Sequence, residues 1–173
     1  MNKRLILFIV AVAAQLFILA AVPAQKIHAR VTGKTILLKT APVAPYSIMS
    51  GYYVTLGYEI SNPKVSTEWK NWLDGKPVWV VLRSDPNNNV WDAVSVYDKW
   101  PSVPDDCVVI KGKISGQRIE YGIESYFIPE DARDKVVRDL RNNSKEAKAE
   151  VKVDSSGNAA ITKLIIQDRV YAY

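Results

Sequence analysis

Few side chains in this sequence combine the types and spacing that catalysis needs. A cysteine nucleophile requires a nearby base, but the single cysteine, Cys107, is far along the chain from the single histidine, His28. One cysteine also excludes an internal disulfide and a Cys-x-x-Cys metal site. We therefore expect Cys107, at the start of the apolar stretch CVVI, to be a small buried core residue.

Two arrangements keep a hydrolase open as an alternative function. Adjacent carboxylates occur at 105–106 and 130–131, but acid–base catalysis needs carboxylates that converge in space with different pKa values. The other arrangement is a serine–lysine dyad, with Ser47 or Ser50 as the nucleophile and Lys111 as the base. Either arrangement would make the protein a membrane-bound hydrolase. The dyad would make it signal-peptidase-like, and the carboxylates would make it carboxylate-based.

Glu124 is the carboxylate that the sequence places among apolar neighbours. It lies between Ile123 and the aromatic pair at 126–127. A carboxylate buried alone is costly, so we expect a basic partner, either Arg118 or Arg133. A single carboxylate offers little chemistry, and we interpret this site as structural rather than as a ligand site.

The charge distribution argues against a nucleic-acid-binding protein. The formal net charge is +5, and two of the cations, Lys3 and Arg4, precede an apolar N-terminal run. The other basic residues are spread along the chain, whereas nucleic-acid binding requires a clustered basic surface. The sequence contains no P-loop, no Gly-x-Gly-x-x-Gly fingerprint and no His/Cys set for zinc. We therefore expect neither a cofactor nor a metal.

The elements that must position these residues begin with the apolar run LILFIVAVAAQLFILAAV, residues 5–22, in which Gln15 is the strongly polar member. As a helix it would be about 27 Å long, close to the thickness of a bilayer's hydrocarbon core. We expect residues 1–24 to form a single-pass signal anchor, 25–33 a stalk, and 34–173 an extracytoplasmic β-rich domain. A cleaved signal peptide remains the alternative.

The expected location is the bacterial cytoplasmic membrane, with the N-terminus inside and the domain in the periplasm. Lys3 and Arg4 precede the run in the manner of a signal sequence. Basic residues also follow the run, among them Lys26 and Arg30, so the positive-inside count does not by itself favour this orientation.

Turn residues divide the rest of the chain into short strands. Pairs of β-prone segments flank DPNNN, SGQ and DSSGN and predict three hairpins. Earlier strands are predicted at 34–40 and 51–60, a short helix at 66–75 and a C-terminal helix at about 130–141. The ending QDRVYAY is expected to extend the last strand. The predicted fold is mainly β, built of antiparallel hairpins as a sandwich or partly open barrel, with an N-terminal transmembrane helix and one short C-terminal helix.

All five tryptophans lie between positions 69 and 100. Trp79 and Trp91 follow strand patterns, and we expect them in the core. Trp69 and Trp72 share a helical face with Leu73. Their indoles could pack inside the domain or form a contact surface for carbohydrate or the membrane interface, and the sequence leaves both open.

The stretch GYYVTLGY, residues 51–58, resembles the signature of the bacterial GDYXXLXY proteins. Gly51, Tyr53, Leu56 and Tyr58 match that signature, and Tyr52 stands where the family has Asp. Loss of an acidic group there argues for a structural or binding role of the motif. The period-two pattern of a strand places Leu56 and Tyr58 on the inner face, with Tyr53 pointing outward.

A second stretch, YGIESYFIPE at 121–130, is also similar to a segment of that family. A third, VKVDSSGNAAITKL, is similar to the family's C-terminal hairpin. The resemblance covers about residues 35–166. The motif residues of the second stretch are Tyr121, Gly122, Glu124, Tyr126, Phe127 and Glu130. The resemblance implies a single membrane segment, an extracytoplasmic domain without an assigned activity, and a multi-pass membrane protein as a partner. We therefore expect a membrane-anchored accessory or binding protein without catalysis.

Overall fold

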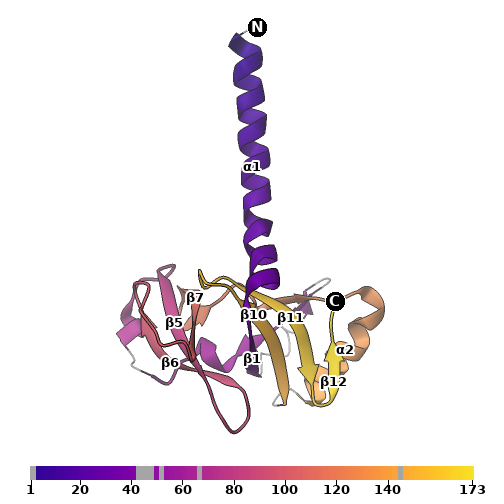
Figure 1. The fold of residues 1–173 in the computed structure, drawn as a ribbon. Helices are drawn as coiled ribbons and strands as arrows, with labels where there is room; N and C mark the ends of the chain where they lie inside the picture. The colour runs from indigo at the N-terminus through magenta and orange to yellow at the C-terminus, as the bar shows by residue number, and fades with distance from the viewer. Residues whose placement is uncertain (1–2, 42–48, 51–52, 66–67, 144–145) are drawn as a thin grey trace.

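The structure is a computed structural model that describes residues 3–41, 49–50, 53–65, 68–143 and 146–173. The chain is mainly β, with antiparallel sheets that form a half-barrel and a long N-terminal helix that projects from it (Figure 1). The predicted antiparallel β fold is confirmed to this extent. A hydrophobic core shared by the sheets fills the half-barrel.

The N-terminal helix α1 (Lys3–Thr32) is continuous and enters the domain with its last turns. Residues 25–32 of the segment expected as a stalk therefore form the end of this helix. Ala29 is fully buried, and Gly33 donates its main-chain N–H to the Ala29 carbonyl at 3.0 Å. Over the described residues, no helix is long and apolar enough to cross a membrane. The structure thus gives no support to the expected transmembrane helix.

The largest sheet has the strand order β12-β11-β10-β1-β4. Its strands are β1 (Lys34–Ala41), β4 (Gly57–Tyr58), β10 (Ala147–Val153), β11 (Ala159–Ile166) and β12 (Arg169–Tyr171). Along β10 every second side chain is buried, because successive residues of a strand face opposite sides of a sheet. The pattern directs the valines and alanines of β10 into the core.

The end of the chain differs from the prediction. Residues 167–173 do not extend β11; they turn back, and β12 pairs with β11 in antiparallel register, with Tyr171 opposite Leu164. The turn passes through Gln167, which has a positive φ of 53°. Gln is uncommon in that conformation, so the sequence carries no strong turn signal at this position.

The second sheet contains two of the predicted hairpins and has the order β6-β5-β7-β8. Its strands are β5 (Pro77–Ser84), β6 (Trp91–Tyr97), β7 (Cys107–Ser115) and β8 (Arg118–Glu120). Asp85 accepts a hydrogen bond from the main-chain N–H of Asn87 in the first turn, at 3.0 Å. Gly116 supplies a positive φ of 58° in the second turn, which glycine adopts without steric cost.

The third sheet shows that the predicted strand 51–60 is divided between two sheets. Its order is β2-β3-β9, with β2 (Met49–Ser50), β3 (Tyr53–Thr55) and β9 (Ser125–Phe127). After β3 the chain passes to the large sheet, where β4 pairs with β1, and then forms a 3-10 turn, η2 (Glu59–Ser61). Gly51 and Tyr52 of the motif lie outside the described residues.

The two predicted short helices differ in outcome. The C-terminal helix is confirmed as α2 (Arg133–Asn142), preceded by the 3-10 turn η4 (Glu130–Ala132). The earlier one is only a 3-10 turn, η3 (Glu68–Asn71). Trp69 is buried, but Leu73 is 82% exposed, so the predicted common face of these two side chains is wrong.

The remaining core predictions concern Cys107 and two tryptophans. Cys107 is buried and belongs to a small apolar cluster with Val81 and Val109, as predicted. Trp91 belongs to the main core, whereas Trp79 is partly buried against the small cluster. Burial of Trp69 removes one of the two indoles considered for a contact surface.

Candidate functional site

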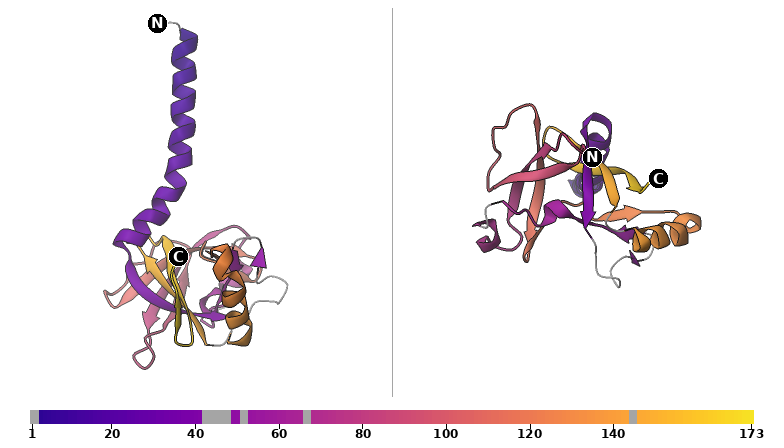
Figure 2. Two further views of the ribbon diagram at one scale, coloured as in Figure 1. Left: turned by 90° about the vertical axis from the view of Figure 1, so that its right-hand side faces the viewer. Right: turned by 90° about the horizontal axis from the view of Figure 1, so that it is seen from below.

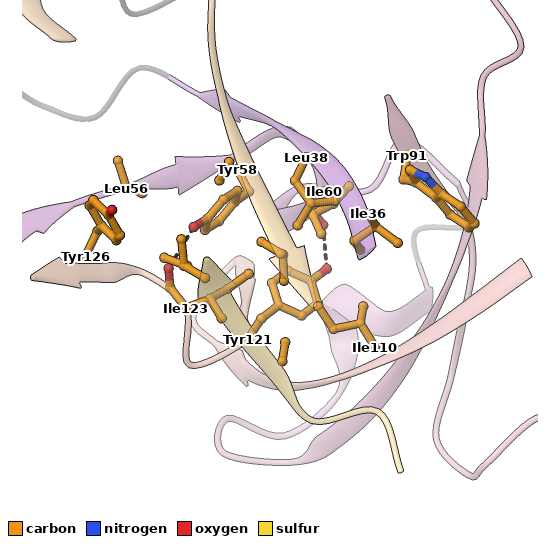
Figure 3. Close-up of a cluster of buried hydrophobic side chains, with 14 of the residues drawn as sticks. Ile36, Leu38, Leu56, Tyr58, Ile60, Trp91, Ile110, Tyr121, Ile123 and Tyr126 are labelled. Atoms are coloured by element: carbon orange, nitrogen blue, oxygen red, sulfur yellow. Dashed lines mark hydrogen bonds between the residues drawn. The ribbon is translucent and has the colours of Figure 1, made fainter. Parts of the chain in front are cut away.

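The two motif stretches lie side by side and are joined by reciprocal hydrogen bonds. The Tyr58 hydroxyl donates to the carbonyl oxygen of Ile123 at 2.7 Å, and the Tyr121 hydroxyl donates to the carbonyl oxygen of Ile60 at 2.6 Å (Figure 3). Tyr58 of the first stretch thus bonds a main-chain group of the second, and Tyr121 of the second bonds Ile60 in η2, directly after the first stretch. We call this pair of contacts the tyrosine clasp.

A main-chain contact strengthens the same junction. The Leu56 N–H donates to the Glu124 carbonyl at 2.7 Å, at the residue where the chain passes from β3 to β4. Leu56 and Tyr58 are buried, as the strand pattern predicted. Tyr53 is only partly buried, and its ring packs against Phe127 with 5.7 Å between centroids. The predicted inner and outer faces are confirmed for these residues.

The clasp hydroxyls remain protonated donors. Burial raises the pKa of Tyr58 and of Tyr121 well above the usual value, and the nearby charge of Glu124 raises both further. Burial also raises the pKa of Tyr126, whose hydroxyl donates to the Tyr171 carbonyl at 2.9 Å. Three motif tyrosines therefore act as hydrogen-bond donors to the main chain.

Glu124 bonds the main chain and not Arg118, one of its two predicted partners. Its Oε1 accepts a hydrogen bond from the main-chain N–H of Tyr121 at 2.6 Å. Of the two predicted partners, Arg118 bonds Glu120 instead, with 3.2 Å between Nη2 and Oε1. The side chain is only partly buried, so water can solvate its charge. The prediction of a buried ion pair with Arg118 is therefore wrong.

Gly122 turns the chain within the second motif stretch. Its φ is +75°, a conformation that side chains rarely adopt, while the space around its missing Cβ is open. The glycine is thus required by the backbone conformation and not by crowding. The turn brings the Glu124 carboxylate back to the Tyr121 N–H.

The outer side of the same stretch forms the floor of a hollow that we call the basal groove. It has a volume of about 540 Å³ and lies between residues 122–129, the end of α1 and residues 159–161 of β11. Lys26, Ile27 and Arg30 of α1 line it together with Phe127. Figure 2 shows the end of α1 against the sheet that contains β11. The lining is mainly apolar, with two cations and no acidic side chain.

A second hollow adjoins the basal groove at Lys26 and Gly122 and has a volume of about 410 Å³. Lys111 and Lys113 line it, as do the carboxylates of Glu120 and Glu124. Its charges are therefore mixed. Of the predicted motif residues, Gly122 lines both hollows, Tyr126 and Phe127 line the basal groove, and Tyr121 and Glu124 line the second hollow.

Among the residues that the structure describes, the predicted hydrolytic groups do not come together in a catalytic site. Asp106 pairs with Arg83 at 3.3 Å on the surface, and residues 130–131 are exposed in η4. Ser47 and the side chain of Ser50 lie outside the described part of the chain, so the dyad with Lys111 is not tested. Within the described residues, no group of His, Cys, Asp or Glu side chains is arranged to hold a metal ion.

Sequence reasoning missed Asp154, which connects α1 to the β10–β11 turn. Its buried side chain accepts hydrogen bonds from the main-chain N–H groups of Ser156 and Asn158 and from the Asn158 amide. Its Oδ2 also lies 3.3 Å from Nδ1 of His28. Burial alone would raise the Asp154 pKa, but these hydrogen bonds outweigh it and lower the pKa. The turn sequence DSSGN was the available signal, because Asp commonly bonds the main chain two residues later.

Comparison with known proteins assigns the chain to a family. The sequence model of the GDYXXLXY protein family matches residues 15–164, most of the chain. The chain belongs to the GDYXXLXY family. Searches of curated proteins and of solved structures gave no match. In this member of the GDYXXLXY family, the described motif residues Leu56, Tyr58 and Tyr121 lie at the junction of the sheets.

Proposed function

We propose that this GDYXXLXY protein is a membrane-anchored accessory or binding protein. In this proposal the N-terminus lies in the cytoplasm of a bacterial cell, α1 crosses the cytoplasmic membrane once, and the β domain lies in the periplasm. The domain partners a multi-pass membrane protein and performs no catalysis.

The observation that carries the proposal is the exposure of apolar side chains along α1. Leu7, Phe8 and Phe17 are 69%, 66% and 76% exposed, and the first part of α1 projects away from the domain (Figures 1 and 2). Large exposed apolar surfaces on a protein mark contacts with a membrane or another protein. The uncharged run at 5–22, preceded by Lys3 and Arg4, is typical of a signal anchor.

The binding role is supported by what the motif residues do. The hydroxyls of Tyr58 and Tyr121 are committed to main-chain carbonyls, so they hold the second motif stretch in place and are not free to react. The outer side of that stretch is the floor of the basal groove. A rigid, motif-built surface beside the anchor is suited to recognition.

The topology is tested with fusions to the C-terminus of the full-length chain. A periplasmic domain predicts an active alkaline phosphatase fusion and a dark fusion to a fluorescent protein that does not fold after Sec export. The reverse pattern would place the domain in the cytoplasm. Extraction of the protein by carbonate, without detergent, would contradict the anchor itself.

The partner is tested by purification of the full-length chain from detergent-solubilised membranes. We expect a multi-pass membrane protein to co-purify with it. The control bait carries α1 without the β domain. Equal recovery of the same proteins with both baits would contradict a partner that the domain recognises.

A further inference from the structure

We propose that the basal groove binds an anionic phospholipid, with Lys26 and Arg30 holding the headgroup phosphate and the apolar lining receiving the start of an acyl chain. This inference rests on the membrane anchoring proposed above. It assigns the groove a ligand class and places the domain directly on the membrane surface.

The position of the groove along α1 is the first argument. The helix continues without interruption from the apolar run into the domain, so the domain has no flexible stalk that would lift it from the bilayer. Lys26 and Arg30 follow Val22 by four and eight residues, which is roughly 6 and 12 Å along a helix axis. The headgroup layer outside the hydrocarbon core is roughly 5–8 Å thick on each side. Lys26 would therefore lie at the level of lipid phosphates, with Arg30 just beyond it.

The charge of the groove is the second argument. The Lys26 Nζ donates to the Gly122 carbonyl at 3.3 Å, and the Arg30 Nη2 donates to the main-chain oxygen of Tyr173 at 3.2 Å. These bonds hold both cations at the groove, and among the described residues neither cation forms an ion pair with a carboxylate side chain. The adjoining hollow, which Lys26 also lines, carries the carboxylates of Glu120 and Glu124 as well as Lys111 and Lys113. We therefore place the phosphate in the basal groove, whose lining has no acidic side chain.

The apolar lining is the third argument, because it distinguishes a lipid from a free anion. Ile27 and Phe127 are 60% and 66% exposed at the groove, and Ile123, Ile128 and Ile161 lie behind them. Free phosphate would leave Ile27 and Phe127 in water. A phospholipid covers them with its acyl chain and satisfies the two cations with its headgroup, which matches the amphipathic lining of the groove.

A competing occupant is an extended peptide, because β9 is the edge strand of its described sheet and its residues line the groove. Edge strands can pair with a peptide strand through their free main-chain groups. The two cations and the position next to the apolar run favour the lipid, and the peptide is one of the outcomes of the test.

The test uses the full-length chain in nanodiscs of phosphatidylcholine, with and without phosphatidylglycerol, and follows amide hydrogen exchange of residues 122–129. We expect phosphatidylglycerol to slow exchange of this segment. The double variant Lys26→Gln/Arg30→Gln should need about 30-fold more phosphatidylglycerol for the same protection, because each basic side chain at an anionic surface contributes about 1 kcal/mol. The variant Arg138→Gln/Arg141→Gln removes the same charge from α2, outside the groove. It should change the phosphatidylglycerol requirement less than about twofold.

Several results would overturn the inference. Equal protection by both lipids would make the groove an apolar contact without headgroup selectivity. Equal protection by glycerol 3-phosphate in solution would reduce it to an anion site. Protection by an acidic peptide but by neither lipid would favour strand addition. Failure of the chain to co-elute with nanodiscs would instead contradict the membrane anchor, so loss of the lipid site and loss of the proposed function give different results.

Discussion

At the scale of single residues, the tyrosine clasp gives the motif a physical role. The Ile60 and Ile123 side chains are buried in the core, and their carbonyl oxygens receive the hydroxyls of Tyr121 and Tyr58. A buried carbonyl without a donor is costly. Phenylalanine at either tyrosine would fill the same space but leave one of these oxygens without its bond.

We expect Tyr58→Phe and Tyr121→Phe each to lower the free energy of unfolding by about 1–3 kcal/mol, the usual cost of an unsatisfied buried group. Tyr53→Phe is the matched control. Its hydroxyl makes no hydrogen bond among the described residues, and the change should stay within about 0.5 kcal/mol. Denaturant titration measures all three. Equal midpoints for the clasp variants and the control would show that the hydroxyl bonds do not hold the junction.

Glu124 allows a second residue-scale prediction, because its side chain accepts a hydrogen bond from the main-chain N–H of Tyr121. Glu124→Gln keeps an oxygen acceptor and should change the free energy of unfolding by less than about 1 kcal/mol. Glu124→Ala removes the acceptor and should cost about 1–3 kcal/mol. The same titration distinguishes the two variants. A large loss in the Gln variant would mean that the negative charge itself is needed.

At the scale of elements, the β10–β11 turn and the last turns of α1 form one joint. Gly33 lies against this joint, where a Cβ atom would come within 2.8 Å of the Val153 main-chain nitrogen. Asp154 orders the turn and contacts His28 of α1. Because the helix and the sheet meet here, the charge of one buried carboxylate affects the attachment of α1.

The lowered pKa of Asp154 predicts how stability depends on pH. A carboxyl group with a depressed pKa in the folded state stabilises the fold above its ordinary pKa of 3.8, and the contribution is lost as the pH falls through the folded-state pKa. Asp154→Asn should therefore be less stable than the wild type by about 1.5–3 kcal/mol at neutral pH. The difference should shrink as the pH falls below 3.8.

Urea titrations of the two proteins across this pH range measure the difference directly. Asp168→Asn is the control, since Asp168 is exposed and has no described partner. If the difference in free energy of unfolding between wild type and Asp154→Asn is constant with pH, the negative charge of Asp154 does not contribute to stability.

At the scale of the whole molecule, the sheets share one main core. Its members include Ile110 of β7 and Leu164 of β11, both fully buried, from different sheets. Val54 of β3 and Tyr126 of β9 bring the third sheet into the same core. The β domain should therefore unfold as one cooperative unit and not sheet by sheet.

We predict that Ile110→Ala and Leu164→Ala each cost about 2–5 kcal/mol and lower the same unfolding transition. The tryptophans all lie between positions 69 and 100, so their fluorescence reports on the half of the domain around β5 and β6. Amide exchange in β10 and β11 reports on the other half. If Leu164→Ala accelerates exchange in β10 and β11 while the fluorescence midpoint is unchanged, the domain contains two independent units.

The family, the local elements and the buried faces could be predicted from the sequence. The hairpins follow from turn residues such as Gly116, and α2 follows from local signals around Pro129. Burial of Leu56 and Tyr58 follows from the alternation of a strand. These properties depend on residues close together in the chain, and the backbone geometry of a turn or strand determines them locally.

Only the tertiary structure decided how these elements meet. It divided residues 51–60 between two sheets, turned residues 167–173 back onto β11, and extended α1 through the expected stalk. It also gave Glu124 a main-chain partner and brought Lys26 next to Gly122, 96 positions away. The physical reason is that strand pairing and side-chain contacts depend on which distant segments pack together, whereas the local pattern defines only which side of each segment is apolar.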